Sequence, residues 1–341
     1  MLETIWFVLW GVLWAVYFML DGFDFGVGML MPFLARSEEE KRTLYQSLGP
    51  FWDGNEVWLI TAGGVTFAAF PLTYAVMFSS LYSALMLVLF ALIFRAVSIE
   101  FRNQVARPGW RAAWDFGMFL GSLLPALLLG VAFGNIFQGI PIDGRGAFHG
   151  TLLTLLNPYA LLTGVVFVML FLVHGALWQA VKSDGDLHHR SVSAARKLWP
   201  VLLAVAVVFL VATRSATALW NNYLGNPVLF LIPLVPVAGL LLTRLFLARQ
   251  SCGRAWFSSS LTIVGCTLFG VIGLYPSLLP SSLDPAYSLT VHNSASSPLT
   301  LKIMLVVALI FVPVVIAYQT WVYVLFRGKV TAEELAYEEA Y

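Results

Sequence analysis

The sequence predicts an all-α, polytopic integral membrane protein. Of its 341 residues, 60% are hydrophobic and only 11% are charged, whereas roughly 25% of the residues in soluble domains are charged. The apolar residues are concentrated in runs of about twenty, the length that an α-helix needs to cross a bilayer. Nineteen basic and eighteen acidic residues nearly balance. This charge balance gives no reason to expect a nucleic-acid partner.

Nine apolar runs follow one another along the chain. The first has neither the basic start nor the small-residue cleavage site of a signal peptide, so we expect a retained helix. The boundary between the second and third runs is the least distinct, because only Pro71 and Thr73 indicate a turn there. The predicted spans are 5–30, 53–71, 74–97, 112–134, 155–180, 198–218, 228–248, 256–278 and 300–325.

The distribution of Lys and Arg predicts how these spans are oriented. Fourteen basic residues fall in the connections after spans 1, 3, 5 and 7 and in the C-terminal tail, whereas the opposite connections hold only Arg145. Basic loops usually face the cytoplasm. We therefore expect a periplasmic N-terminus and a cytoplasmic C-terminus, an arrangement that requires an odd number of spans.

We expect a single membrane domain over residues 1–341, without a soluble domain. Spans 1 to 4 within 1–134 and spans 5 to 8 within 155–278 are predicted to form two comparable four-helix bundles. The last span, 300–325, is then a peripheral helix. The charged connection 35–49 is predicted to be a short solvated loop whose charges lie on the surface.

Four carboxylates in the first two spans are the strongest candidates for a functional site. Asp21 and Asp24 are three residues apart, as are Asp53 and Glu56, and this spacing places both members of a pair on one helix face. Ionisable groups within a membrane are costly and usually functional. Carboxylates that converge there would share protons, so the pattern predicts a proton relay. Because Pro50 precedes the second pair, a simple helix cap is an alternative.

Glycines interleave with the first acidic pair, at Gly22, Gly26 and Gly28. Small residues let membrane helices approach one another closely. We expect these glycines to serve packing, which would also bring the two acidic pairs together.

The segment FRAVSIEFR at the end of the third span contains a deeply placed arginine. Arg95 needs a carboxylate partner at that depth, which Asp53 or Asp24 could supply, unless its long side chain reaches the interface instead. Trp52 and Trp58 flank the second acidic pair and could line a quinone or lipid site. Asp115, at the start of the fourth span, is expected to cap a helix.

The residues predict no metal site and no redox centre on this chain. A haem held between two helices needs His, Met or Cys ligands on facing positions, and His174 is the only histidine within a predicted span. A pairing of His174 with a methionine stays open. Cys252 and Cys266 do not have the spacing of a metal site, so we expect free thiols.

Four long motifs resemble subunit II of the cytochrome bd-type quinol oxidases: DGFDFGVGML, GPFWDGNEVWLITAGG, FRAVSIEFR and LLGVAFGNIFQG. The resemblance runs along essentially the whole chain. It implies a respiratory terminal oxidase in the bacterial cytoplasmic (inner) membrane, which oxidises quinol and reduces oxygen to water. It also implies that haems b and d belong to a larger subunit I, with which this chain would pair and whose haem insertion it would support.

The resemblance further implies roles for individual residues. The positions of Asp24 and Asp53 are associated in the family with a cytoplasmic proton pathway at the subunit interface, and we extend this role as a hypothesis to Asp21, Glu56 and Glu100. The short connection 219–227 resembles the compact branch often called cyanide-insensitive. A small single-helix subunit is a further partner that the resemblance leaves open.

Two other functions compete with this interpretation. Paired carboxylates near broken helices also occur in proton-coupled transporters, which would act alone and colourless. A purely structural assembly subunit would need none of the acids for turnover. A larger haem-carrying chain that copurifies would separate the oxidase subunit from the transporter.

Overall fold

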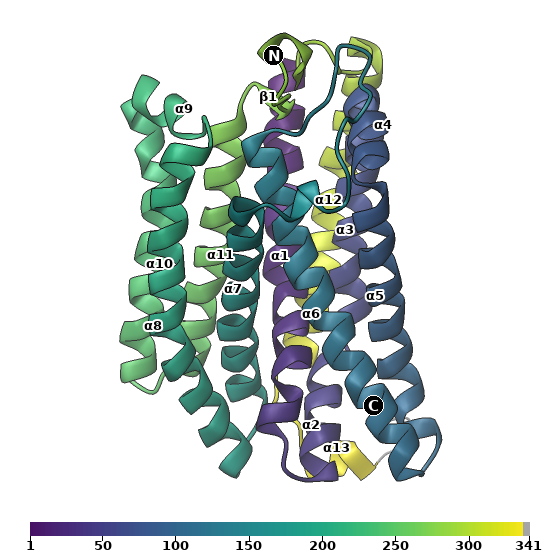
Figure 1. Ribbon diagram of the computed structural model, residues 1–341. Coiled ribbons are helices and arrows are strands. Elements are labelled where there is room, and N and C mark those ends of the chain that lie inside the picture. The colour runs from purple at the N-terminus through teal and green to yellow at the C-terminus, as the bar shows by residue number, and fades with distance from the viewer. Residues whose placement is uncertain (337–341) are drawn as a thin grey trace.

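The computed structural model describes residues 1–336, and in it long helices pack side by side (Figure 1). The only sheet in these residues is a small antiparallel pair, β1 (Ser277–Leu279) and β2 (Leu289–Thr290), in which Ser277 pairs with Thr290. The helices are α1 (Leu2–Leu34), α2 (Glu38–Leu48), α3 (Trp52–Ala69), α4 (Pro71–Ser80), α5 (Tyr82–Phe101), α6 (Pro108–Gln138), α7 (Pro158–Lys182), α8 (Gly185–Ala216), α9 (Trp220–Gly225), α10 (Leu231–Ala248), α11 (Cys252–Leu274), α12 (Pro298–Leu325) and α13 (Ala332–Ala336).

The all-α membrane architecture is confirmed. Within residues 1–336, eight helices are long and apolar enough to cross a bilayer. Helix α3 occupies the second predicted span but is not one of the eight, because its first turns carry Asp53, Asn55 and Glu56. The ninth crossing and the orientation in the membrane therefore stay predictions. The N-terminus and helix α13 do lie at opposite ends of the bundle (Figure 1).

Two predicted segments were wrong in detail. The connection 35–49 is not a loop, because it contains helix α2, whose N-cap Ser37 accepts a hydrogen bond from the Glu40 N–H at 3.2 Å. Three glutamates in its first turn also favour a helix N-terminus. The predicted span 74–97 is two helices, α4 and α5, which meet at Leu81.

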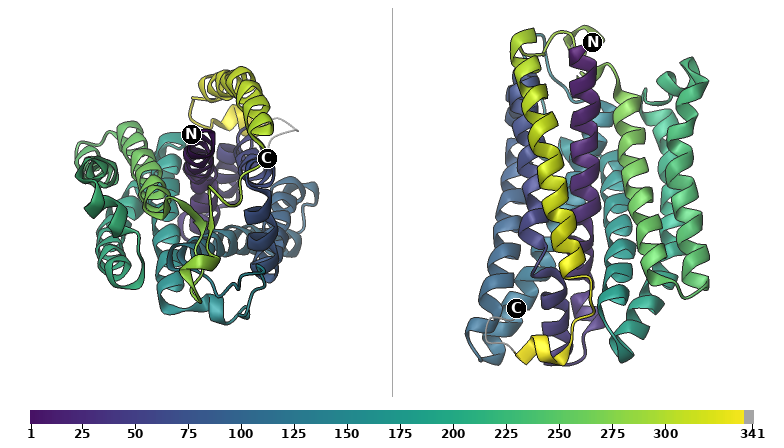
Figure 2. Two further views of the ribbon diagram at one scale, coloured as in Figure 1. Left: turned by 90° about the horizontal axis from the view of Figure 1, so that it is seen from above. Right: turned by 180° about the vertical axis from the view of Figure 1, so that it is seen from behind.

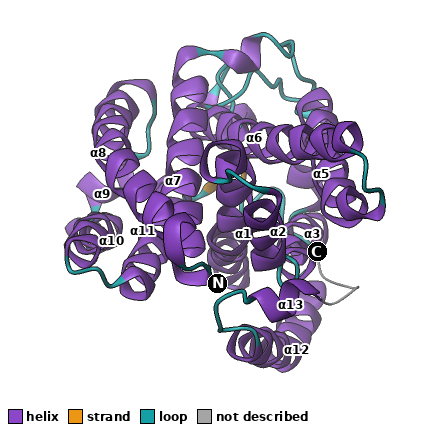
Figure 3. Ribbon diagram, turned by 90° about the horizontal axis from the view of Figure 1, so that it is seen from below, coloured by secondary structure: helices purple, strands orange, loops and turns teal. Residues whose placement is uncertain are grey.

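Helix α1 lies at the centre of the molecule. It contacts α3, α6, α7 and α11, and the view from below places it between the α3–α6 side and the α8–α11 side (Figure 3). It approaches α7 closely at Gly26 and Gly175, where an added Cβ on either residue would overlap backbone atoms of the other helix. Both sides of the molecule therefore share one apolar core, to which Trp10, Phe133 and Ile263 belong.

Helix α12 lies on the outside of the bundle, along α1 and α3 (Figure 2). Apart from Leu301, its described side chains are at most half-buried. The chain after α12 then crosses the end of the bundle at which α2 lies, and forms α13 (Figure 3). This end is the one that the basic connections predict to be cytoplasmic.

Candidate functional site

A buried ionic cluster joins the first helices in the interior of the bundle. Arg95 of α5 lies with its Nη1 2.6 Å from Oδ1 of Asp21 on α1, and both side chains are fully buried. Its Nη2 lies 3.4 Å from Oε2 of Glu56 on α3, whose side chain is 21% exposed. The Phe25 ring, whose centroid is 4.4 Å from the guanidinium carbon, covers the cation. The cluster thus holds one cation between two carboxylates from different helices.

The partner predicted for Arg95 was wrong. We expected Asp53 or Asp24, whereas the ion pairs form with Asp21 and Glu56. Arg95 reaches Asp21 because α5 is anchored closely against α6, where Gly121 has no side chain to hold the Arg95 backbone away. The rotation of α1 then decides which of its two aspartates faces α5.

Asp24 has a different set of partners. It is fully buried, and its Oδ2 accepts a hydrogen bond from Nδ2 of Asn55 on α3 at 2.7 Å. The Oδ1 of Asn55 in turn accepts a hydrogen bond from the hydroxyl of Tyr323 on α12 at 2.8 Å. A continuous chain of hydrogen bonds therefore links three helices and ends on a buried carboxylate.

Asp53 and Glu100 lie apart from this cluster. Both are exposed on the surface of the chain, and neither forms an ion pair with any residue that the structure describes. The Asp53 carboxylate accepts a hydrogen bond at 2.6 Å from the N–H of Gly54 in the first turn of α3. The structure therefore brings together three of the five predicted acids.

The two tryptophans beside the second acidic pair differ in their surroundings. Trp52 is half-buried. Trp58 is buried, and its indole N–H donates to Oε1 of Gln319 on α12 at 2.9 Å. Trp58 therefore links α3 to α12 through this hydrogen bond.

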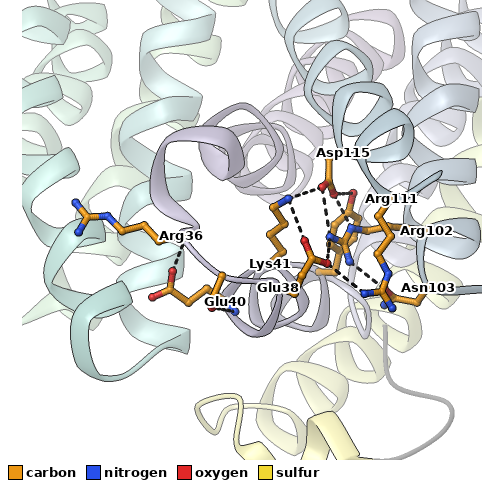
Figure 4. Close-up of polar contacts among 10 residues, drawn as sticks. Arg36, Glu38, Glu40, Lys41, Arg102, Asn103, Arg111 and Asp115 are labelled. Atoms are coloured by element: carbon orange, nitrogen blue, oxygen red, sulfur yellow. Dashed lines mark hydrogen bonds and ion pairs between the residues drawn. The ribbon is translucent and has the colours of Figure 1, made fainter. Parts of the chain in front are cut away.

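A second ionic network, which the sequence reasoning missed, ties α2 to the start of α6 (Figure 4). Asp115 was expected to cap a helix, but it lies within α6 and pairs with Arg102 at 2.5 Å and with Lys41 at 2.8 Å. Glu38 pairs with Arg102 at 2.9 Å and with Arg111 at 3.4 Å. Glu38 and Lys41, which were expected to lie on the surface of a solvated loop, therefore hold α2 against the bundle.

The charges in this network also stabilise one another. Partial burial favours the neutral form of Glu38, but Arg102 and Lys41 outweigh it and hold the pKa of Glu38 below its ordinary value of 4.5. Partial burial likewise opposes the charge on Lys41, but Asp115 and Glu38 outweigh it and raise its pKa above 10.5. Both groups are therefore charged at neutral pH.

His174 does not fit a haem ligand. It is fully buried, its Nδ1 lies 3.1 Å from Oγ of Ser259, and its Nε2 lies 3.0 Å from the Met19 carbonyl oxygen. The Trp256 indole stacks on the imidazole with a centroid distance of 5.3 Å. Both ring nitrogens are thus occupied by protein groups. Cys252 and Cys266 are free thiols.

Of the residues that form the site, sequence reasoning missed Asn55 and Tyr323. Asn55 lies between Asp53 and Glu56 and is one of few amides within a predicted span. Tyr323 is four residues after Gln319 on the otherwise apolar helix α12, and this spacing places both polar groups on one face. That pair was the signal available in the sequence.

Comparison with known proteins gives a consistent picture. The family model for cytochrome bd terminal oxidase subunit II matches residues 2–326. The chain is 38% identical to cytochrome bd-I ubiquinol oxidase subunit 2 of Escherichia coli strain K12, over 98% of this chain and 96% of that one. It is 37% identical to cytochrome bd ubiquinol oxidase subunit 2 of Bacillus subtilis strain 168, over 98% of each.

The fold has a counterpart among solved structures. One chain of the bd oxidase from Geobacillus thermodenitrificans superposes with a TM-score of 0.79, covering 95% of this chain and 98% of that chain at 18% identity. The similarity in sequence extends over nearly the whole length, and the motifs that carry the resemblance include Asp21, Asp24, Glu56 and Arg95. The chain therefore belongs to the cytochrome bd terminal oxidase subunit II family.

Proposed function

We propose that this chain is the non-haem subunit of an inner-membrane bd-type quinol:oxygen oxidoreductase, and that it conducts cytoplasmic protons toward the haem-bearing subunit I. The observation that carries the proposal is the buried cluster in which Asp21 and Glu56 share Arg95, with Asp24 one helical turn further along α1. Three carboxylates accompany one cation there. Because there are more carboxylates than cations, a carboxylate can take up and release a proton while the cation keeps a partner.

The charges explain how the cluster would handle a proton. Asp21 lies closest to Arg95 and balances the arginine charge. Glu56 and Asp24 then remain as the carboxylates that can gain a proton without leaving a buried cation unbalanced, because like charges held together disfavour full ionisation. A proton would pass between them while the Asp21–Arg95 pair stays in place.

The path would begin at the predicted cytoplasmic end of α3. Asp53 is exposed in the first turn of this helix, and Glu56 is three residues further along, partly exposed. Residues three apart lie on the same face, so Asp53 would collect protons from water and Glu56 would receive them. Glu100, exposed at the end of α5, stays in the proposal as a second collecting acid.

Subunit I would cover the face on which these acids open. An ionisable side chain that faces lipid is costly, and Glu56 is partly exposed within a bundle that would lie in the membrane. We propose that haems b and d, the oxidation of quinol and the reduction of oxygen all reside in that partner, whose haem insertion this chain supports. Trp52 is then available to contact quinone or lipid, and a small single-helix subunit could complete the complex.

Conservative substitutions in the intact complex test this function. We expect Asp24→Asn and Glu56→Gln each to reduce oxygen consumption by tenfold or more, in the range of a lost acid–base group, while haem content per complex is retained. Glu39→Gln is the matched control, because Glu39 is exposed on α2 and forms no ion pair with any residue in 1–336. Unchanged turnover in haem-replete Asp24→Asn complex would refute the proton path.

A further inference from the structure

Helix α12 is attached to the bundle by polar contacts in an otherwise apolar stretch. Its described side chains are mostly exposed, yet Gln319 donates to the Gly54 carbonyl oxygen at 2.7 Å and accepts from the Trp58 indole at 2.9 Å. Polar contacts of this kind join helices in a membrane, where apolar surface alone gives little driving force. Both contacts of Gln319 are made to the first turns of α3, beside the acidic cluster.

Tyr323 makes the next polar contact on the same face of α12. Its hydroxyl donates to Oδ1 of Asn55 at 2.8 Å, and Nδ2 of Asn55 donates to Oδ2 of Asp24 at 2.7 Å. Asn55 is 1% exposed and Asp24 is 0% exposed, so water does not compete for these groups. The contact therefore reaches the buried acid through a single amide.

An amide placed in this way can present either its oxygen or its NH₂ group to Asp24. The Tyr323 hydroxyl holds the Asn55 oxygen, so the NH₂ group turns toward the carboxylate. A hydrogen bond donated to a carboxylate favours its ionised form. Without the hydroxyl, the amide oxygen could turn toward Asp24 and accept a hydrogen bond from its protonated carboxyl group instead.

The surrounding residues fix Tyr323 itself. Its ring packs against Phe51 with a centroid distance of 4.6 Å and against Trp178 at 6.0 Å. One turn further along, the buried Lys182 ammonium donates to the carbonyl oxygens of Phe326 and Gly328. These contacts set the position of α12 along the bundle axis and thus keep the hydroxyl opposite Asn55.

We propose that Tyr323 is a positioning residue for Asp24 and acts through Asn55. The inference rests on the proposed role of Asp24 in proton conduction. The charged groups near Asp24 are Asp21 on its own helix and Arg95 on α5, and Glu56 on α3 pairs with the same Arg95. Tyr323 would thus orient the donor to Asp24 from α12, a helix whose one buried residue is Leu301.

Tyr323→Phe in the intact complex tests the inference, because it removes the hydroxyl and keeps the ring. We expect the pH dependence of oxygen reduction to move toward higher pH by about one unit, the size expected for loss of one hydrogen bond to a charged group. The infrared carboxyl band that disappears in Asp24→Asn should also shift. Tyr318→Phe is the control, because Tyr318 lies on the same helix with 62% of its surface exposed.

A double substitution tests whether the effect passes through Asn55. Asn55→Leu removes the donor to Asp24 and should produce a shift at least as large. Adding Tyr323→Phe to Asn55→Leu should then change neither the pH profile nor the infrared band, because coupled residues are not additive. Additive effects, or a wild-type profile and band in Tyr323→Phe, would overturn the inference.

The same experiments separate this inference from the proposed function. If Asp24→Asn leaves turnover unchanged, the proton path fails. Even then, Tyr323 would be established as the residue that positions Asp24 if Tyr323→Phe shifts the infrared band in the otherwise unaltered complex but causes no further shift when added to Asn55→Leu. If Asp24→Asn abolishes turnover and Tyr323→Phe leaves the band in place, the positioning role alone fails.

Discussion

Arg95 is the residue on which the buried cluster depends. Its guanidinium is fully buried, lies against Phe25 and touches carboxylates from two other helices. Taking such charges out of water is expensive, and the cost is recovered only while each charge keeps its partner. The cluster therefore couples α1, α3 and α5 as well as carrying protons in the proposed mechanism.

Removing the cation alone should be strongly destabilising. We expect Arg95→Gln to lower the free energy of unfolding by roughly 3–5 kcal/mol, because Asp21 stays buried without its counter-charge. The measurement is denaturation of the purified complex in mixed micelles. Arg36→Gln, at an exposed arginine, is the control. The double variant Arg95→Gln with Asp21→Asn should recover part of the loss, and the interpretation fails if it does not.

The depth of these acids could be predicted from the sequence, but their partners could not. Asp21, Asp24 and Glu56 lie in apolar runs, and the cost of charge in a membrane is a local property of such a run. Whether Arg95 meets Asp21 or Asp24 depends on how α1 is rotated against α5, which no local pattern fixes. The three-residue spacing also predicted that Asp53 and Glu56 share one helix face. It did not indicate that Asp53 lies in the first turn of the helix and is exposed.

At the scale of elements, α2 is a helix that hydropathy alone does not predict, because its sequence is highly charged. Its sequence is rich in Glu, Lys and Arg, so hydropathy identifies only a gap between spans. The helix is specified by the Ser37 cap and is held in place by the network around Asp115 (Figure 4). The break at Leu81 between α4 and α5 was also missed, because it lies within a continuous apolar run and neither Gly nor Pro marks it.

The α2 network gives a prediction for pH dependence. The pKa of Glu38 is lowered, so its contribution is present above 4.5 and is lost as pH falls through its value in the folded protein. The pKa of Lys41 is raised, so its contribution is present below 10.5 and is lost as pH rises through its folded value. Hydrogen-exchange protection of α2 amides, corrected for intrinsic rates, should therefore be constant between these limits.

Substitution of Asp115 should lower this protection at every pH. Asp115→Ala removes one of the two carboxylates that Arg102 and Lys41 share and leaves them only Glu38, whose side chain is 50% exposed. We therefore expect faster exchange in α2 at all pH values, with little change in the core helix α7. Asp143→Ala, in the connection at the other end of the bundle, serves as the control. Equal protection of α2 in both variants would show that the network does not hold the helix.

At the scale of the whole molecule, the fold depends on how closely α1 and α7 approach. Gly26 and Gly175 face one another so tightly that neither position has space for a methyl group. Because α1 also contacts α3, α6 and α11, a displacement there would spread to both sides of the bundle. The sequence did indicate packing glycines near the acids, although it could not identify α7 as the neighbour.

A single methyl group tests this arrangement. We expect Gly26→Ala to lower the free energy of unfolding by about 1–3 kcal/mol or more, because a rigid backbone lies where the Cβ would be. The yield of assembled, haem-containing complex should fall with it. Gly64→Ala adds the same methyl group where nothing lies within 4 Å, and it should leave yield and stability unchanged. Equal behaviour of the two variants would contradict the packing argument.

The outlying position of α12 also bears on biogenesis. Translation proceeds from the N-terminus, so α12 is synthesised after the other seven described helices that are long and apolar enough to cross a bilayer. Only then can Asn55 meet the Tyr323 hydroxyl. Until that moment the Asn55 amide that faces Asp24 is not held by the Tyr323 hydroxyl. A polypeptide that stops before Tyr323 would therefore leave the Asn55 oxygen without this hydrogen bond and α12 without its contact to Asn55.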